Sequence, residues 1–391
     1  MSNKILIVTG EASGDLHGGL LTDELKKINP DLEIFAVGSK KMEASGAKII
    51  FESTQLAIFG FTEMFSRLNL IKEAFDKIKE FVRAERPSLV VLIDYPGFNI
   101  RLAGFLDEQK IPVIYYISPQ IWAWNKGRIN VLKKLVKKMI VVFPFEEEIY
   151  KSNGMDVEFV GHPLLDLVKP KISKKEIIEK FGFTEGENSP IIGLLPGSRY
   201  EEINNLLPVM VNVCRKLKKN IPAIQFYICW ANNLDIKLIE KRLKKANFPV
   251  SIISGWNYEL ISVSDLVMVA SGTATLETAI LETPMVILGK ISFFSSLLAR
   301  ILIKIPYIGL PNILAGEMIV PELFQENVRT KKVFLAVLEL IRNENTRKKM
   351  RNKLTAVREK LGDSGAAGRA ARAIINEMDK IRHSRESGNL L

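Results

Sequence analysis

The chain has 391 residues, of which 47% are hydrophobic and 25% charged, and it holds two cysteines. This composition excludes a disordered chain and a disulfide scaffold and fits a reducing cytoplasm, and the length predicts two domains. The formal net charge of +11 indicates a surface that attracts anions, and it does not choose among nucleic acid, anionic lipid and phosphorylated metabolites.

The first half of the chain alternates short apolar runs with helical segments. Continuous apolar strands separated by helices are typical of a parallel sheet covered on both faces, so this half is predicted to be Rossmann-like. The predicted strands are 4–10, 33–39, 88–94, 112–118 and 139–144.

The loop after the first strand, GEASGDLHG (10–18), is the first candidate site. Ligands of open parallel sheets bind beyond the carboxyl ends of the strands. Two interpretations stay open here: a tight turn in which Ser13 or Asp15 caps the following helix, or a loop that binds acceptor hydroxyls. On the second interpretation the acceptor residues are Ser13, Gly14, Asp15 and His17.

The strand SLVVLID (88–94) delivers Asp94 to its carboxyl end, and Tyr95-Pro96-Gly97 then turns the chain away from the sheet. A carboxylate in this position can accept a proton from a substrate hydroxyl. Asp94 is therefore the first candidate for a general base. The alternative is that it caps the next helix or pairs with a basic side chain.

Aromatic residues follow the next strand in YYISPQIWAWNKGR (115–128). Trp122 and Trp124 either belong to the core or form, with Asn125, a wall of the acceptor site. The basic run 126–138 has one apolar helical face, so it is a solvated amphipathic helix or a patch that faces an anion.

Beyond Gly161-His162-Pro163 the chain becomes polar and rich in turns, which predicts a linker. A second series of strands then follows, so the protein is expected to contain two similar α/β halves. These strands are 191–197, 225–230, 251–254, 266–271 and 285–290, and helices are expected from 330 to about 382.

Two loops of the second half resemble anion sites. LLPGSR (194–199) and ASGTATLE (270–277) each leave a strand through glycine and begin a helix, whose free N–H groups and dipole favour a phosphate. Either loop alone could be an ordinary helix cap. Together they predict a diphosphate site formed by Gly197, Ser198, Arg199, Ser271, Gly272 and Thr273, with Glu277 placed to bind ribose hydroxyls and Lys290 to meet the anion. No divalent-metal motif accompanies these loops, so neither a metal nor a cofactor is expected.

Two apolar segments suit a lipid substrate. Residues 61–82 form a helical stripe typical of a core helix. The segment 291–310 is nearly long enough to cross a membrane, but Arg300 and Lys304 interrupt it, and we expect it to lie at a membrane surface or in the core.

The motifs together resemble the lipid-A-disaccharide synthase family, glycosyltransferase family 19. They are GEASGD (10–15), SPQIWAW (118–124), FPFE (143–146), GHP (161–163), LLPGSR (194–199), ASGTATLE (270–277), LPNILAG (310–316) and PELFQ (321–325), and they cover nearly the whole chain.

The resemblance implies a GT-B fold, in which two Rossmann-like parallel-sheet domains face each other across a cleft and a C-terminal helix crosses back to the first. The implied domains are 1–165 for the acceptor and catalysis, a linker 166–190, 191–362 for the UDP-sugar, the returning helix 363–382 and a disordered tail 383–391. Asn312 and Gln325 fall in motifs that the family uses on the UDP side.

The implied reaction is an inverting transfer without metal, from UDP-2,3-diacylglucosamine to 2,3-diacylglucosamine 1-phosphate (lipid X). Its product is the β(1→6) disaccharide of lipid A. The expected location is the cytoplasmic face of the inner membrane, peripherally attached, with a homo-oligomer left open. One departure is Gly97, where members of the family often have a second Asp, and another is the sequence Leu288-Gly289-Lys290, which lacks a common aromatic residue.

Two other functions, an epimerase and a binding module, each fit part of the sequence. A UDP-N-acetylglucosamine 2-epimerase would use the same fold without a lipid acceptor, which the segment 291–310 argues against. A nucleic-acid or anionic-membrane binding module would fit the charge, but the sequence has no compact basic motif interleaved with aromatic residues, so no nucleic-acid partner is expected.

Overall fold

A computed structural model describes residues 3–56, 68–119, 127–186, 189–230, 236–244, 246–290 and 306–387. It divides into two compact units, formed by Met1–Pro163 with Leu361–Leu391 and by Leu164–Lys360. Among the described residues, no helix is both long enough and apolar enough to span a membrane.

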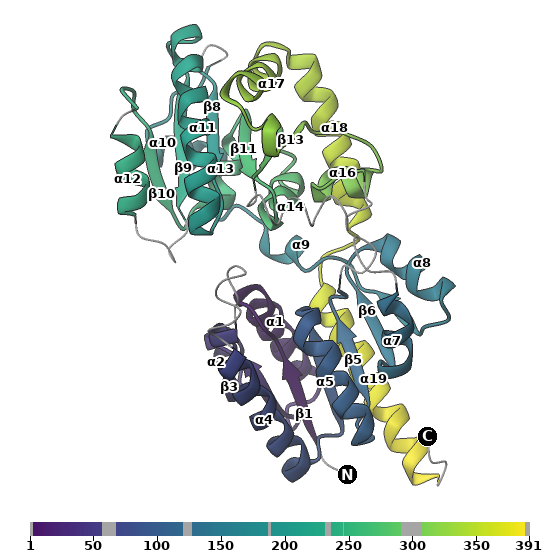
Figure 1. Ribbon diagram of the computed structural model, residues 1–391. Coiled ribbons are helices and arrows are strands. Elements are labelled where there is room, and N and C mark those ends of the chain that lie inside the picture. The colour runs from purple at the N-terminus through teal and green to yellow at the C-terminus, as the bar shows by residue number, and fades with distance from the viewer. Residues whose placement is uncertain are drawn as a thin grey trace. The chain divides into compact units, whose positions relative to one another are not determined.

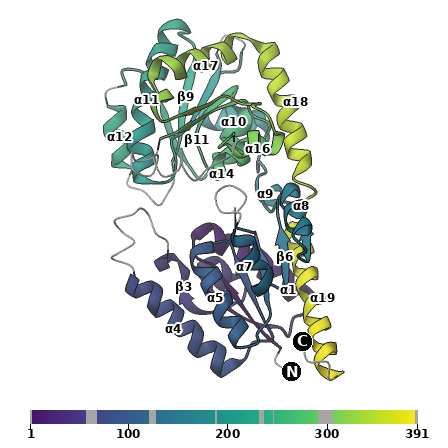
Figure 2. The same cartoon turned by 45° about the vertical axis from the view of Figure 1, so that its right-hand side comes forward.

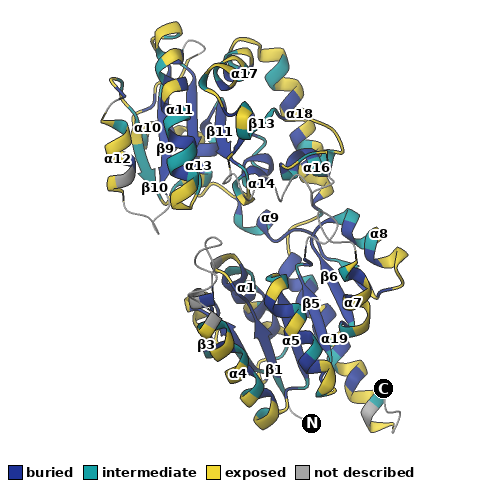
Figure 3. Cartoon of the chain, in the orientation of Figure 1, coloured by how far each residue is buried: buried dark blue, intermediate teal, exposed yellow. Residues whose placement is uncertain are grey.

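The first unit is a parallel sheet with strand order β3-β2-β1-β4-β5-β6-β7 (Figure 1). Its central strands are buried on both faces, as their continuous apolar sequences require (Figure 3). The strands are β1 (Lys4–Val8), β2 (Glu33–Gly38), β3 (Lys48–Glu52), β4 (Leu89–Ile93), β5 (Val113–Tyr116), β6 (Lys138–Val141) and β7 (Val157–Phe159).

Helices of the first unit follow the strands that they connect. The predicted apolar stripe of 61–82 becomes α4, whose buried residues Ala74, Ile78 and Val82 join the core; residues 57–67 lie outside the described part of the chain. The helices are α1 (Ala12–Ile28), α2 (Lys40–Ala44), α4 (Leu68–Glu85), α5 (Pro96–Glu108), α7 (Arg128–Leu135), α8 (Pro144–Ser152) and α19 (Ala366–Glu386), with the 3₁₀ turn η1 (Ser53–Leu56).

The second unit repeats this design with strand order β10-β9-β8-β11-β12-β13, again all parallel. In both units the first strand pairs with strands on either side, so the order of connection reverses there. Such a switch point leaves a crevice at the carboxyl ends of the strands. The strands are β8 (Ile191–Leu195), β9 (Gln225–Trp230), β10 (Ser251–Ser254), β11 (Leu266–Ala270), β12 (Met285–Gly289) and β13 (Glu322–Phe324).

Helices α11 and α17 of the second unit pack against each other beside this sheet, as Figures 1 and 2 show. The helices are α9 (Leu164–Leu167), α10 (Lys174–Phe181), α11 (Tyr200–Asn220), α12 (Lys237–Leu243), α13 (Asn257–Val263), α14 (Thr273–Ile280), α16 (Leu310–Ala315), α17 (Thr330–Arg342) and α18 (Glu344–Lys360), with the 3₁₀ turn η2 (Gln325–Asn327).

The structure corrects two predicted boundaries. The stretch 166–190 is not a separate linker, because α10 packs on α13 and the backbone N–H of Lys171 donates to Glu259, which ties it to the second unit. The tail is not disordered from 383, because α19 continues to Glu386 with Ile381 buried. Residues 388–391 lie outside the described part.

The last helix, α19, belongs to the first unit and packs against α1 (Figures 1 and 2). Its buried face consists mostly of small residues, which allows the two helices to approach closely. That face includes Ala366, Ala370, Ala371 and Ile374.

Candidate functional site

The two predicted phosphate loops meet in one pocket of the second unit. Strands β8 and β11 are neighbours, with Leu195 opposite Val269, so the loops that follow them leave the sheet side by side. The pocket at these strand ends has a volume of about 330 Å³. Its lining includes the predicted residues Gly197, Ser198, Arg199, Ser271, Gly272, Thr273 and Glu277.

The loop after β11 presents an open helix terminus. Gly272 has φ +148, a conformation that favours glycine, and α14 begins at the next residue. The N-cap residue Gly272 has no side chain that could cap this end, and the hydroxyl of Thr275 donates to the carbonyl of Gly272 at 2.7 Å. The N–H of Thr275 already donates to the carbonyl of Gly272 at 3.1 Å, so the N–H groups of Thr273 and Ala274, the first two of the eight-residue α14, are the ones that can meet an anion.

The loop after β8 is arranged differently, because a carboxylate already occupies it. Glu202 accepts from the backbone N–H groups of Ser198 at 3.0 Å and Arg199 at 3.3 Å, and from the Arg199 guanidinium at 3.1 Å. Sequence reasoning missed Glu202, although an acidic residue at the third position of a helix is the sign of a capping box.

The floor of the pocket carries the other carboxylate. Burial raises the pKa of Glu277. The hydrogen bond that the Tyr258 hydroxyl donates to it at 3.3 Å acts in the opposite direction but is the smaller effect. Asn257 and the buried Cys229 also line the pocket, and sequence reasoning missed both. Asn257 begins α13 and Cys229 lies in β9, both far from the two loops in sequence, so no local pattern indicated them.

Three residues predicted for the UDP side do not line this pocket. Lys290 and Gln325 follow the ends of β12 and β13. Asn312 is a correction: it is fully buried, its amide donates to Val320 and Glu322, and its oxygen accepts from Ile319 and Val320. Its hydrogen-bonding groups hold α16 to β13 and to the segment before it, so both polar atoms of its side chain have protein partners.

Asp94 follows β4 at the switch point of the first unit, in an unusual backbone conformation. Asp94 has φ +47 and Tyr95 has φ +48. The carbonyl of Asp94 accepts from the hydroxyl of Tyr115 at 2.5 Å and from the amide of Asn99 at 2.8 Å, which fixes the turn. The side chain of Asp94 consequently projects from a rigid point.

The electrostatic surroundings of Asp94 suit a base. Asp94 reaches the surface, and the surrounding protein still removes enough water to raise the pKa of its carboxyl to about 6, with the charge of Glu11 acting in the same direction. Glu11 belongs to the loop after β1, whose Gly10 lies so close to the ring of Tyr95 that an added Cβ would be 2.2 Å from it. The loops after β1 and β4 are therefore packed together.

The residues predicted for the acceptor loop after β1 differ in their exposure. Ser13 is exposed on the first turn of α1, and Gly14 packs on Thr9. Asp15 is a correction: it is buried, and its carboxylate accepts from the backbone N–H groups of Ser39 at 2.5 Å and Lys41 at 3.0 Å. It caps the start of α2, so its carboxylate is already bonded to the backbone.

The third polar residue of this loop, His17, is held neutral. Burial lowers its pKa to about 4, and its Nδ1 has no hydrogen-bond partner within the described residues. His162 lies in the segment after β7. Burial lowers its pKa to about 3, and the nearby His17 acts in the same direction. At neutral pH both rings are uncharged.

Some predicted features lie outside the described residues. Trp122, Trp124 and Asn125 are among them, as is most of the segment 291–310. Of the residues that the structure describes, no three or more His, Cys, Asp or Glu side chains are grouped so that they could hold a metal.

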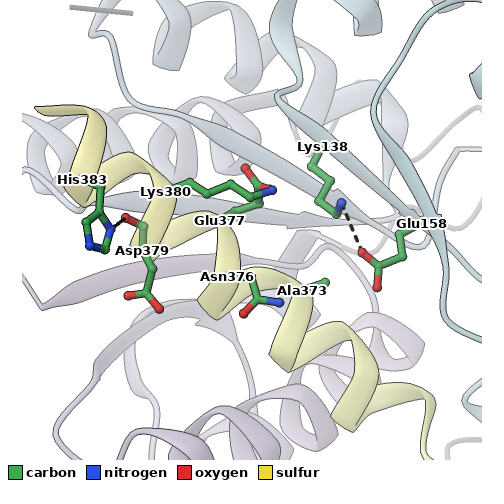
Figure 4. Close-up of a pocket in the computed structure, with 8 residues that line it drawn as sticks. All are labelled: Lys138, Glu158, Ala373, Asn376, Glu377, Asp379, Lys380 and His383. Carbon is green, nitrogen blue, oxygen red and sulfur yellow. Dashed lines mark hydrogen bonds and ion pairs between the residues drawn. The ribbon is translucent and has the colours of Figure 1, made fainter. Parts of the chain in front are cut away.

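Two larger hollows lie elsewhere and contain none of the predicted residues. One, of about 600 Å³, lies between α19 and the strands β6 and β7; Figure 4 shows Lys138 there paired with Glu158. The other, of about 720 Å³, lies at the amino ends of β8 and β11, beside Ile191 and Asp265. Ligands of doubly wound sheets bind at the opposite, carboxyl ends, so the smaller pocket is the better candidate.

Two doubly wound parallel sheets, with a pair of glycine-led helix termini at one switch point, define a protein of the GT-B fold class. Solved structures match over the whole chain at this level. They include the UDP-GlcNAc 2-epimerase from Neisseria meningitidis bound to UDP-GlcNAc (TM-score 0.63, 17% identity, 96% of this chain and 100% of that one). The calicheamicin glycosyltransferase CalG4 gives TM-score 0.60 at 14% identity, covering 97% and 99%. Identities this low show the fold alone.

The sequence comparison is more specific. The lipid-A-disaccharide synthetase family model matches residues 5–374. The lipid-A-disaccharide synthase of Syntrophus aciditrophicus is 42% identical over 371 residues, which cover 95% of this chain and 96% of that protein. The chain belongs to the lipid-A-disaccharide synthase family and is a glycosyltransferase of lipid A biosynthesis. The epimerases are neighbours in fold only.

Proposed function

We propose that this enzyme transfers 2,3-diacylglucosamine from UDP to the 6-hydroxyl of 2,3-diacylglucosamine 1-phosphate (lipid X). The products are the β(1→6) disaccharide 1-phosphate and UDP. The observation that carries this proposal is the pocket in which the loops after β8 and β11 converge, in a chain of this family.

On the donor side, we propose that the diphosphate binds at the open end of α14 and at Arg199. As the bond between the anomeric carbon and the phosphate oxygen breaks, negative charge grows on the departing diphosphate. The N–H groups after Gly272 and the guanidinium of Arg199 can stabilise that charge. Glu277 lines the same pocket, where its carboxylate can accept a hydrogen bond from a ribose hydroxyl.

On the acceptor side, we propose Asp94 as the general base. The acceptor hydroxyl attacks the anomeric carbon from the face opposite UDP, and its proton passes to the Asp94 carboxylate. A pKa of about 6 leaves Asp94 ionised at neutral pH and still basic enough to take the proton. Because the attack displaces UDP in one step, the configuration at the anomeric carbon inverts.

Both proposed substrates carry acyl chains, so we propose that the enzyme works at the cytoplasmic surface of the inner membrane without spanning it. The net charge of +11 favours an anionic lipid surface.

The direct test is incubation of the enzyme with UDP-2,3-diacylglucosamine and lipid X, with UDP release and disaccharide formation measured together. We expect both products in equal amounts. UDP-N-acetylglucosamine, which lacks the acyl chains, is the control donor and should be a poor substrate. Absence of disaccharide from the acylated pair would reject the proposed reaction.

A further inference from the structure

The charge around the donor pocket is unfavourable for the ligand that it is proposed to hold. Among the described residues that line it, Arg199 is the only cation, and it stands against the carboxylates of Glu202 and Glu277. A diphosphate would add further negative charge. Two carboxylates thus outnumber the one guanidinium, and Glu202 is the carboxylate that contacts Arg199 directly.

Glu202 accepts three hydrogen bonds from the loop after β8. One carboxylate oxygen accepts the backbone N–H groups of Ser198 and Arg199 at 3.0 and 3.3 Å, and the other accepts the guanidinium of Arg199 at 3.1 Å. These are the groups that would bind a phosphate oxygen. The carboxylate of Glu202 therefore occupies the position of an anion.

The turn at Gly197 makes this contact possible. A Cβ on Gly197, where φ is +109, would lie 2.2 Å from the carboxylate oxygen of Glu202. The carboxylate therefore lies directly against the backbone of the turn. The end of α14 across the pocket has no such side-chain cap, so one phosphate loop is filled and the other is open.

We propose that Glu202 is an intramolecular competitor for the diphosphate of the donor. It keeps the loop and Arg199 ordered, swings away when the diphosphate binds, and returns as UDP leaves. The exposed side chain of Arg199, with 58% of its surface accessible, is then free to turn to the phosphates. This inference rests on the proposed function of the pocket, and it assigns Glu202 to the control of UDP affinity.

The test compares dissociation constants for UDP, inorganic pyrophosphate and uridine, measured by calorimetry on the full-length enzyme. Glu202→Gln keeps an oxygen that can cap the loop but removes the charge. We expect it to bind UDP and pyrophosphate about tenfold more tightly, the order of one charge-assisted hydrogen bond. Uridine affinity should not change. Glu201→Gln, on an exposed neighbour in the same helical turn that does not line the pocket, is the matched control and should resemble the wild type.

A purely structural cap predicts the opposite sign, because loosening the loop would weaken UDP binding. Unchanged or weaker binding of pyrophosphate by Glu202→Gln would overturn the inference, as would an equal gain for uridine. Glu202→Ala provides a second variant, and it too should tighten pyrophosphate binding and lower the inhibition constant of the product UDP. Failure of the donor assignment shows separately, as wild-type enzyme that binds UDP no better than pyrophosphate.

Discussion

At the scale of single residues, the position of Asp94 depends on its neighbours more than on its own chemistry. Left-handed backbone at a residue other than glycine costs about 1–3 kcal/mol and persists only where the surroundings enforce it. Here two successive residues adopt it, and the hydroxyl of Tyr115 and the amide of Asn99 hold the carbonyl between them. Such a strained, well-supported carboxylate at a strand end is typical of a functional position.

Asp94→Asn is expected to reduce kcat at least about 100-fold, since it removes proton acceptance in the transition state. UDP affinity should remain, because the UDP pocket belongs to the second unit. In the wild type, kcat/KM should rise with pH as the carboxyl ionises and level off above about 6, the pKa of Asp94. A pH–rate profile of both enzymes measures this.

Glu11→Gln provides the control for the pH limb. Its charge raises the pKa of Asp94, so removing it should lower that pKa and move the rising limb to lower pH. A limb that stays in place in this variant, or that survives in Asp94→Asn, would show that another group titrates.

At the scale of elements, α1 and α2 are joined by the side chain first expected to bind the acceptor. Asp15, on the first turn of α1, accepts N–H groups at the start of α2. The helices can approach because α1 has glycine at its crossing with α2: a Cβ on Gly18 would lie 2.6 Å from the sulfur of Met42. A helix of only five residues such as α2 depends on this cap.

Asp15→Ala is expected to lower the free energy of unfolding by about 1–3 kcal/mol, because it leaves the buried N–H groups at the start of α2 without an acceptor. Urea unfolding followed by circular dichroism measures the change. Ser13→Ala, at an exposed position of the same turn, should leave stability unaltered. A higher KM for the acceptor with unchanged stability would instead restore the ligand-binding role of Asp15.

At the scale of the whole molecule, the first unit is completed by the end of the chain. Arg369, on α19, donates to the carbonyls of Val160 at 2.8 Å and Asp363 at 2.5 Å. Gly161, with φ +81, passes so near that a Cβ would lie 2.7 Å from this guanidinium. The Gly161-His162-Pro163 motif thus has a structural role, in holding the returning segment. The second unit is continuous in sequence.

Deleting residues 364–391 is therefore expected to unfold the first unit and abolish transfer, while the second unit still binds UDP. Limited proteolysis should digest residues before 164 and spare a fragment near 164–360, and calorimetry should show UDP affinity close to that of the full chain. Loss of UDP binding together with activity would mean that the second unit does not fold independently. Arg369→Ala should destabilise the first unit in the same direction, with the exposed Arg372→Ala as its control.

The sequence by itself determined the two parallel sheets, because most of their buried strands are continuous runs of apolar residues. It also located the loops that follow β1, β4, β8 and β11, since glycine and small residues mark each one. The three-residue strands β7 and β13 are too short to give a comparable signal, whereas β3, with the sequence KIIFE, carries an apolar run that the sequence analysis missed. Family resemblance then supplied the reaction, which no spacing of residues could define.

Only the tertiary structure decided which polar side chains are free to meet a ligand. Asp15 and Asn312 lie in motifs that suggest ligand binding. Both side chains instead accept hydrogen bonds from backbone N–H groups of other segments. Glu202 looks like an ordinary helix cap in the sequence, and becomes an anion in the donor pocket only because β8 and β11 are paired. Hydrogen bonds to other segments set the roles of Asp15 and Asn312, and the pairing of distant strands sets that of Glu202, so a local pattern does not define them.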